Sequence, residues 1–192
     1  MILNRLAAIA LTLTCAMLPA LAKAEKPTQV VIITVSAPAK PDGPVEIPRE
    51  EVKAAVQEAS VALNPKKHGR IWCVPFARAV SGIQIKGDAA TWWKKAADLY
   101  ERGQTPASGA VLTFRSTGKM PKGHVAVVSE VIDSRTILVD QANWVRNRIT
   151  TDTIVVDVSP KNDWSAVRVA NGTSEVLGRV SPTYGFIYPA RG

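Results

Sequence analysis

The side chains best suited to covalent chemistry in this sequence are one thiol and one imidazole. Cys73 follows Trp72 and precedes Pro75, in a stretch ending at Gly82 that predicts a short helix with the cysteine in its first turn. A thiol at a helix N-terminus lies at the positive end of the helix dipole, which favours the thiolate. Cys73 is therefore a candidate nucleophile. The alternative is a small buried hydrophobic residue between Trp72 and Phe76, since free cysteines are commonly buried.

A thiolate that cleaves an amide needs a base to share its proton and later protonate the departing amine, and histidine suits that role near neutral pH. The chain has two histidines. His68 lies in the basic stretch 66–70, which disfavours its cation, and a solvated loop residue is the simpler interpretation. His124 begins the apolar stretch 124–128 directly after the loop 118–123, so its ring is predicted to point into a cleft. Taken alone, this position equally suits a strand-end histidine that hydrogen-bonds to a turn.

A third polar group normally holds the other nitrogen of such an imidazole. The next predicted strand ends in Asp140, Gln141 and Asn143. Because side chains alternate along a strand, Gln141 and Asn143 share one face, and Asp140 lies on the other unless a bulge intervenes. The alternative is a polar strand end followed by an ordinary turn.

Residues 1–24 are predicted to be a bacterial signal peptide. Arg5 precedes an apolar run over residues 6–18, and small residues follow at the spacing of a cleavage site. The run is shorter than the roughly 20 residues needed to cross a bilayer. We therefore expect a secreted or periplasmic protein with no stable membrane insertion after cleavage. Cys15 would leave with the signal, so that Cys73 becomes the only cysteine and no internal disulfide can form.

The remaining chain divides into a linker and one domain. Residues 25–48 contain five prolines among small and polar residues, which predicts a partly disordered spacer. Residues 49–192 are long enough for one domain with a sizeable core. The net charge of +8 favours an anionic partner. Nucleic acid is not expected, because no basic stretch is interleaved with aromatic residues. One cysteine and two histidines do not form a zinc cluster, so no metal or other cofactor is expected.

The predicted elements place helices before strands. Helices are predicted over 48–63 and over about 88–101, the second with Trp92, Ala96, Leu99 and Tyr100 on its buried face. Strands are predicted at 110–115, 124–132, 136–141, 154–158, 166–170 and 184–188. Helices followed by an antiparallel sheet predict an α+β domain.

The order of these motifs resembles a CHAP domain, the cysteine- and histidine-dependent amidohydrolases and peptidases of the papain-like group. The resemblance runs from about residue 70 to residue 144. Its motifs are Trp72-Cys73 at a helix start, Ser81-Gly82, Gly87-Asp88-Ala89 with Trp92-Trp93, Pro106 to Ala110, Gly123 to Val128, and Ala142-Asn143-Trp144.

The resemblance implies a papain-like CHAP fold, with N-terminal helices packed on an antiparallel sheet, Cys73 as nucleophile and His124 as base. Similar proteins cleave peptidoglycan, at the amide joining muramic acid to the stem peptide or within the peptide. Their Glu-x-Asn pair falls on Gln141 and Asn143, and we expect Asn143 to orient the imidazole with Gln141 as support. The glutamine that many members carry before the nucleophile is Trp72 here, so a second oxyanion donor is unidentified.

The expected function is therefore a secreted cysteine amidase or endopeptidase whose partner is peptidoglycan or its stem peptides. Basic residues before Cys73 and His124 would form a rim suited to carboxylates; they are Lys66, Lys67, Arg70, Arg115, Lys119 and Lys122. One alternative is a cysteine peptidase acting on non-murein amides. Another is a catalytically weak wall-binding or scaffolding module. The segment 149–192 is expected to complete the sheet.

Overall fold

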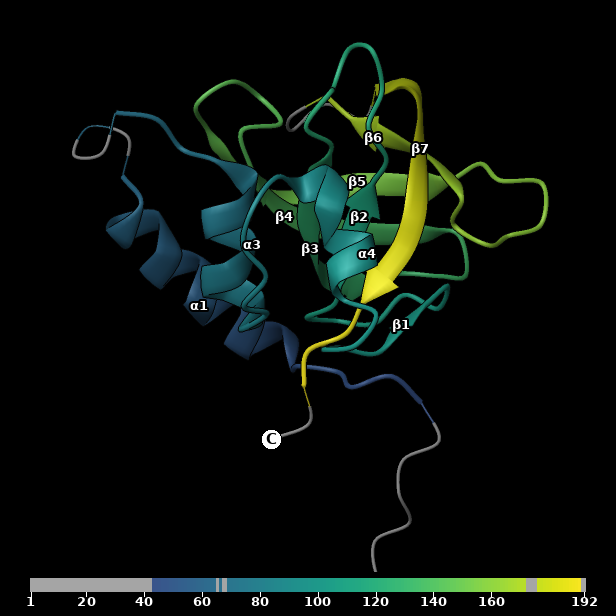
Figure 1. The fold of residues 1–192 in the computed structure, drawn as a ribbon, viewed down its shortest axis with the longest axis horizontal. Coiled ribbons are helices and arrows are strands. Elements are labelled where there is room, and N and C mark those ends of the chain that lie inside the picture. The colour runs from purple at the N-terminus through teal and green to yellow at the C-terminus, as the bar shows by residue number, and fades with distance from the viewer. Residues whose placement is uncertain (1–42, 65, 67–68, 172–175, 191–192) are drawn as a thin grey trace, which may run out of the picture. The chain divides into compact units, whose positions relative to one another are not determined.

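The computed structural model describes residues 43–64, 66, 69–171 and 176–190. The predicted signal peptide, most of the predicted linker and His68 lie outside these residues. Within the described part of the chain, no helix is long and apolar enough to cross a membrane. The helices are α1 (Arg49–Ala62), α3 (Cys73–Ser81), the 3-10 helix η1 (Ala89–Thr91) and α4 (Trp92–Lys95). The strands are β1 (Arg102–Gly103), β2 (Val111–Phe114), β3 (His124–Val131), β4 (Thr136–Ala142), β5 (Ile149–Asp157), β6 (Ala166–Ala170) and β7 (Leu177–Ile187) (Figure 1).

The strands of the described residues form one antiparallel sheet in the order β1-β7-β2-β3-β4-β5-β6. The sheet closes on itself because β7 also pairs with β6. The first part of β7 pairs with β6, and the part from Thr183 to Ile187 pairs with β2. The predicted α+β class and antiparallel sheet are confirmed, and the segment after residue 149 completes the sheet. The closure into a barrel was not predicted.

Two apolar cores lie on the two faces of this sheet. One core joins the helices to the sheet and includes Phe76 of α3 together with Val125 and Val127 of β3. The other core includes Ala126 and Val128, which alternate with them along the same strand. Strand β3 is therefore buried on both faces, and it serves as the common wall of both cores. Figure 1 shows α1 and α3 next to each other beside β3 and β4.

Helix α3 has the predicted boundaries. Trp72 is its extended N-cap residue, and the helix ends at Gly82, whose left-handed backbone (φ 72°) donates its N–H to the Arg78 carbonyl at 3.2 Å. Phe76 and Val80 are buried against the sheet. Because α3 packs on β3, its first residue, Cys73, lies near the beginning of that strand.

The predicted helix over 88–101 is wrong in length. The chain forms η1 and the short α4, and leaves helical geometry after Lys95. Trp92 and Ala96 are buried as predicted, but Leu99 is 66% exposed. The chain turns here so that the Tyr100 hydroxyl accepts the backbone N–H of Gln84 at 2.8 Å. The next residues then enter β1.

A charge network ties α1 to the sheet close to the end of β4. Lys53 donates to both carboxylate oxygens of Asp140, at 2.9 and 3.0 Å, and to Asp152 at 2.7 Å. Asp140 is fully buried, and it also accepts the backbone N–H of Asp152 at 2.8 Å. The pair therefore fixes which residues of β4 face α1 and which face the opposite side.

Gly123, in the loop before β3, has a left-handed backbone and leaves no room for a Cβ atom. Its φ is +67°, and a Cβ there would lie 2.7 Å from the backbone nitrogen of Ala90 and 2.9 Å from the carbonyl of Phe114. Gly82 is a matched control, since its φ is also positive but nothing lies within 4 Å of an added Cβ.

We expect Gly82→Ala to lower the free energy of unfolding by about 1 kcal/mol, from left-handed strain alone. Gly123→Ala should lower it by at least about 3 kcal/mol, because the backbone atoms around it must move. Urea denaturation of both variants measures the difference. Equal losses would contradict the close contact between this loop and η1.

Candidate active site

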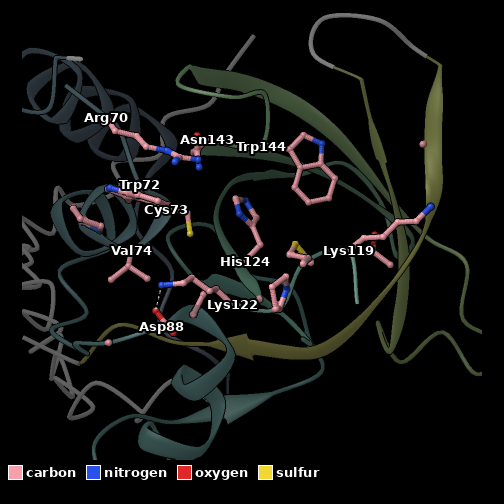
Figure 2. Close-up of a pocket in the computed structure, with 18 of the residues that line it drawn as sticks. Arg70, Trp72, Cys73, Val74, Asp88, Lys119, Lys122, His124, Asn143 and Trp144 are labelled. Atoms are coloured by element: carbon pink, nitrogen blue, oxygen red, sulfur yellow. Dashed lines mark hydrogen bonds and ion pairs between the residues drawn. The ribbon is translucent and has the colours of Figure 1, made fainter. Parts of the chain in front are cut away.

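A cleft of about 860 Å³ contains both predicted chemical groups, Cys73 and His124 (Figure 2). Its walls come from the start of α3, the start of β3, the loop before β3, the segment after β4 and the hairpin of β6 and β7. The side chains that line it include Arg70, Trp72, Cys73, Asp88, Lys119, Lys122, His124, Asn143, Trp144, Asn171, Arg179 and Ser181.

Cys73 is the first residue of α3 and is partly buried. Burial raises the pKa of its thiol, and this is the largest influence on it. The nearby backbone groups of Val125, Val74 and Cys73 itself lower that pKa, whereas the negative charge of Asp88 raises it. The helix N-terminus was expected to favour the thiolate, but desolvation outweighs the backbone donors. Cys73 also packs against the apolar cluster that contains Val125, near the beginning of β3.

His124 is the first residue of β3 and is 4% exposed. Two aromatic side chains pack on its ring, Phe114 with centroids 5.4 Å apart and Trp144 with centroids 5.1 Å apart. Burial lowers the pKa of the imidazole to about 4, and the hydrogen bond to Gln141 acts in the opposite direction. The ring is therefore neutral throughout the physiological pH range.

Gln141 holds the His124 ring: its Oε1 lies 2.9 Å from the ring Nε2. An amide oxygen only accepts, so in this arrangement Nε2 carries the proton and Nδ1 keeps the lone pair. The amide nitrogen of Gln141 is buried without a partner among the described residues. The ring is thus oriented in the tautomer that a general base acting through Nδ1 requires.

The three residues proposed to orient the imidazole have different environments. Asp140 points to the other face of β4, as the alternation predicts, and pairs there with Lys53. Gln141 makes the contact with the ring, although Asn143 was expected to make it. Asn143 lies beyond the end of β4 with a left-handed backbone (φ 63°), and its Oδ1 accepts the Asn147 N–H at 2.8 Å. This turn directs Asn143 away from the path of the strand.

The rim of the cleft is basic, but the residues that form it differ from those expected. Arg70, Lys119 and Lys122 line the cleft as expected, and Arg179 of β7 joins them. Lys122 lies 3.4 Å from Asp88, the one carboxylate that lines the cleft in the described part of the chain, and both side chains are exposed. Among the described residues, Lys66 and Arg115 do not line the cleft, and Lys67 lies outside them. Arg179 was missed because nothing in the sequence shows that the C-terminal hairpin turns toward the nucleophile.

Two residues of the motif around η1 and α4 are placed as follows. The side chain of Asp88, the N-cap residue of η1, makes no capping hydrogen bond. Trp93 stacks on Tyr184 with ring centroids 5.7 Å apart. In the described part of the chain, no three His, Cys, Asp or Glu side chains are grouped as a metal site.

A family model described as the CHAP domain matches residues 65–143. This range contains Cys73, His124, Gln141 and Asn143 and ends before β5. The C-terminal hairpin that supplies Arg179 to the cleft therefore lies outside the match. No curated protein matches the chain.

The buried neutral imidazole should make stability depend on pH. The pKa of His124 is about 4 in the folded chain, against an ordinary value of 6.5. Below pH 6.5 the unfolded chain binds a proton that the folded chain does not, so stability falls as the pH drops from 6.5 toward 4. The expected contribution is about 3 kcal/mol at 1.36 kcal/mol per pKa unit. Urea denaturation between pH 4 and pH 7 measures it.

The control for this pH dependence is the His124→Gln variant, which lacks the titrating imidazole of the wild type. The difference in unfolding free energy between wild type and variant isolates the histidine from the carboxylates. We expect that difference to change in favour of the wild type as the pH rises from 4 to 6.5. A difference that is independent of pH would contradict the lowered pKa.

Gln141→Glu should raise the pKa of His124. A glutamate keeps an acceptor opposite Nε2, removes the amide N–H that lacks a partner, and adds a negative charge that favours the imidazolium. We expect the pKa to rise from about 4 toward its ordinary value of 6.5. An NMR titration of the ring measures it. Gln141→Met, which offers no charge, should leave the pKa low, and an unchanged pKa in Gln141→Glu would show that the side chain at 141 does not control the ring.

Proposed function

Because this chain is a CHAP-domain protein, we propose that it is a secreted cysteine amidase or endopeptidase that hydrolyses amide bonds in the stem peptides of peptidoglycan. The family generally consists of amidases and peptidases that act on the cell wall. Helices packed on an antiparallel sheet agree with the papain-like fold expected of the family. Secretion through the predicted signal peptide at residues 1–24 is part of the proposal.

The observation that carries the proposal is the meeting of three residues at the start of β3. Cys73 packs against the apolar cluster that contains Val125, the residue after His124, and the backbone of Val125 lowers the pKa of the thiol. His124 lines the same cleft, and Gln141 holds its Nε2 so that Nδ1 remains free to accept a proton. A nucleophile, a base and a group that orients the base are the parts that acyl transfer requires.

The resting site holds a thiol and a neutral imidazole, because burial raises the pKa of Cys73 and lowers that of His124. We infer that His124 acts as a general base while the sulfur attacks. As the S–C bond forms, the thiol proton moves to Nδ1 and the carbonyl π electrons move to oxygen. The imidazolium then gives its proton to the amine nitrogen as the C–N bond breaks.

The second half of the reaction returns the enzyme to its resting state. Water attacks the thioester, loses a proton to Nδ1 of His124, and releases the acid as the S–C bond breaks. The sulfur is then protonated again. Gln141 accepts the Nε2 hydrogen in every step, and as an uncharged acceptor it stabilises the imidazolium less than a carboxylate would.

The charge of the cleft supports an anionic substrate. Arg70, Lys119 and Arg179 line it, and Asp88 is paired with Lys122. Carboxylates of stem peptides and anionic wall polymers would be attracted to such a surface. This agrees with peptidoglycan as the substrate class, and it disfavours a substrate rich in basic residues.

The low pKa of His124 supports one alternative, a wall-binding module with weak catalysis. Neither the thiolate nor the imidazolium is favoured in the resting site. The two functions differ in whether bound peptidoglycan is cleaved by a route that requires Cys73.

The mature protein should release new amines from purified sacculi, and Cys73→Ser should lower the rate by about 10³-fold or more, because an alcohol is a far weaker nucleophile than a thiol. His124→Ala should lower it similarly. Fluorescamine labelling of the soluble products measures the rate, and pelleting with sacculi checks that binding is retained. Binding without thiol-dependent release in the wild type would favour the binding module. Hydrolysis of unrelated peptides but not of sacculi would indicate a non-murein substrate.

A further inference from the structure

Trp72, the residue before the nucleophile, is a large aromatic side chain that the fold leaves partly open to solvent. It lines the cleft, is 45% exposed and belongs to neither apolar core of the described residues. Trp144 lines the same cleft but packs on the His124 ring, with centroids 5.1 Å apart. Ligand sites are typically lined by aromatic side chains, so a ring that lines a cleft without packing in a core is available to a ligand.

The position of Trp72 is fixed by its backbone and by one neighbour. It is the extended N-cap residue of α3, and its carbonyl accepts the N–H of Phe76 at 3.4 Å. The N–H of Ile71 donates to Oδ1 of Asn147 at 2.9 Å. The Arg70 guanidinium lies over the indole ring, 4.1 Å from its centroid, and covers one face. The rest of the indole is therefore a rigid aromatic platform at the edge of the cleft.

The cations of the cleft differ in what they contact. Arg70 stacks on the indole, and Lys122 pairs with Asp88. Lys119, in the loop before β3, lines the cleft and makes no ion pair with any residue that the structure describes. Its charge is therefore available to a carboxylate of a ligand.

The proposed reaction gives the cleft a direction. Because His124 protonates the departing amine, the leaving group must lie on the His124 side of the scissile carbonyl, and the acyl group must lie on the other side. Figure 2 shows Cys73 between Trp72 and His124, with Lys119 beyond His124. The aromatic platform thus faces the acyl half of the substrate, and Lys119 faces the amine half.

The two halves of a peptidoglycan amide differ in chemistry. The glycan consists of pyranose rings, whose C–H bonds pack on an aromatic face, and the stem peptide carries carboxylates. A bond within the stem peptide has peptide on both sides. The amide that joins muramic acid to the stem peptide has a sugar on its acyl side and a carboxylate-bearing peptide on its amine side, which is the arrangement that the cleft fits.

We propose that Trp72 and Arg70 bind the sugar ring of muramic acid, and that the bond cleaved is the amide between its lactyl group and the stem peptide. The inference rests on the proposed function and names the bond. The Cys73 sulfur bonds to the lactyl carbonyl carbon, and His124 takes the thiol proton. As the C–N bond breaks, that proton passes to the nitrogen of the departing L-alanine. Water then releases the lactyl carboxylate and restores the thiol.

The first experiment identifies the bond. Purified sacculi are digested with the mature protein, and the new amines are labelled with dinitrofluorobenzene and identified after acid hydrolysis. We expect labelled L-alanine, which Cys73→Ser should not release. Thiol-dependent release of any other labelled residue would overturn the inference and leave the proposed function standing. Absence of all thiol-dependent release would overturn the proposed function.

The second experiment tests the platform by binding, in a Cys73→Ala background that prevents turnover. One probe is N-acetylmuramic acid with its lactyl carboxyl capped as a methylamide, and the other is the free stem tetrapeptide. Trp72→Ala should weaken binding of the capped sugar about fivefold to tenfold, and Trp72→Tyr should restore part of it, since an aromatic face remains. Lys119→Gln should weaken binding of the tetrapeptide about threefold. NMR titrations measure the dissociation constants.

A matched control for the loss of an exposed apolar side chain is Leu99→Ala. Leu99 is 66% exposed and does not line the cleft, so neither probe should bind differently. Weaker binding of both probes to Trp72→Ala, or of neither, would overturn the assignment of Trp72 to the sugar. Weaker binding of the tetrapeptide alone would overturn the proposed direction of the cleft.

Discussion

The contact on which the site depends is the packing of the first turn of α3 against the beginning of β3. Phe76 and Val80 bury one face of α3 against Val125 and Val127. This apolar packing, of about 25 cal/mol per Å² of buried surface, holds the helix in place. Cys73 packs against the same cluster, close to Val125. Since His124 is the preceding residue, one helix–strand interface brings the nucleophile and the base into the same cleft.

Strand β4 holds the His124 imidazole, and two neighbouring polar residues of this strand have different roles. Asp140 faces α1 and pairs with Lys53, whereas Gln141 faces His124. Breaking a buried ion pair by removing one partner typically costs about 3–5 kcal/mol, so a one-residue slip of β4 would be strongly disfavoured. The ion pair thus secures the register that keeps Gln141 against the imidazole, although it takes no part in the chemistry.

Short-range patterns in the sequence predicted α3, the start of β3 and the opposite facing of Asp140 and Gln141, because each depends on local periodicity. Other features depend on partners far along the chain. Strand β7 was predicted only from residue 184, since Pro182 normally excludes a strand interior. In the structure Pro182 lies where β7 changes its partner from β6 to β2. Likewise, the left-handed backbone of Asn143 follows from its bond to Asn147, which residue types alone do not reveal.

The buried, neutral state of the resting pair changes what the rest of the site must supply. An enzyme with a preformed thiolate carries its charge before substrate arrives. Here burial keeps Cys73 and His124 uncharged, and charge separates only as the S–C bond forms. Donors aimed at the developing oxyanion then act where charge first appears, in a partly desolvated cleft that strengthens each hydrogen bond. A neutral Gln141 stabilises the imidazolium only modestly. More of the stabilisation of the transition state must therefore come from donors to the oxyanion.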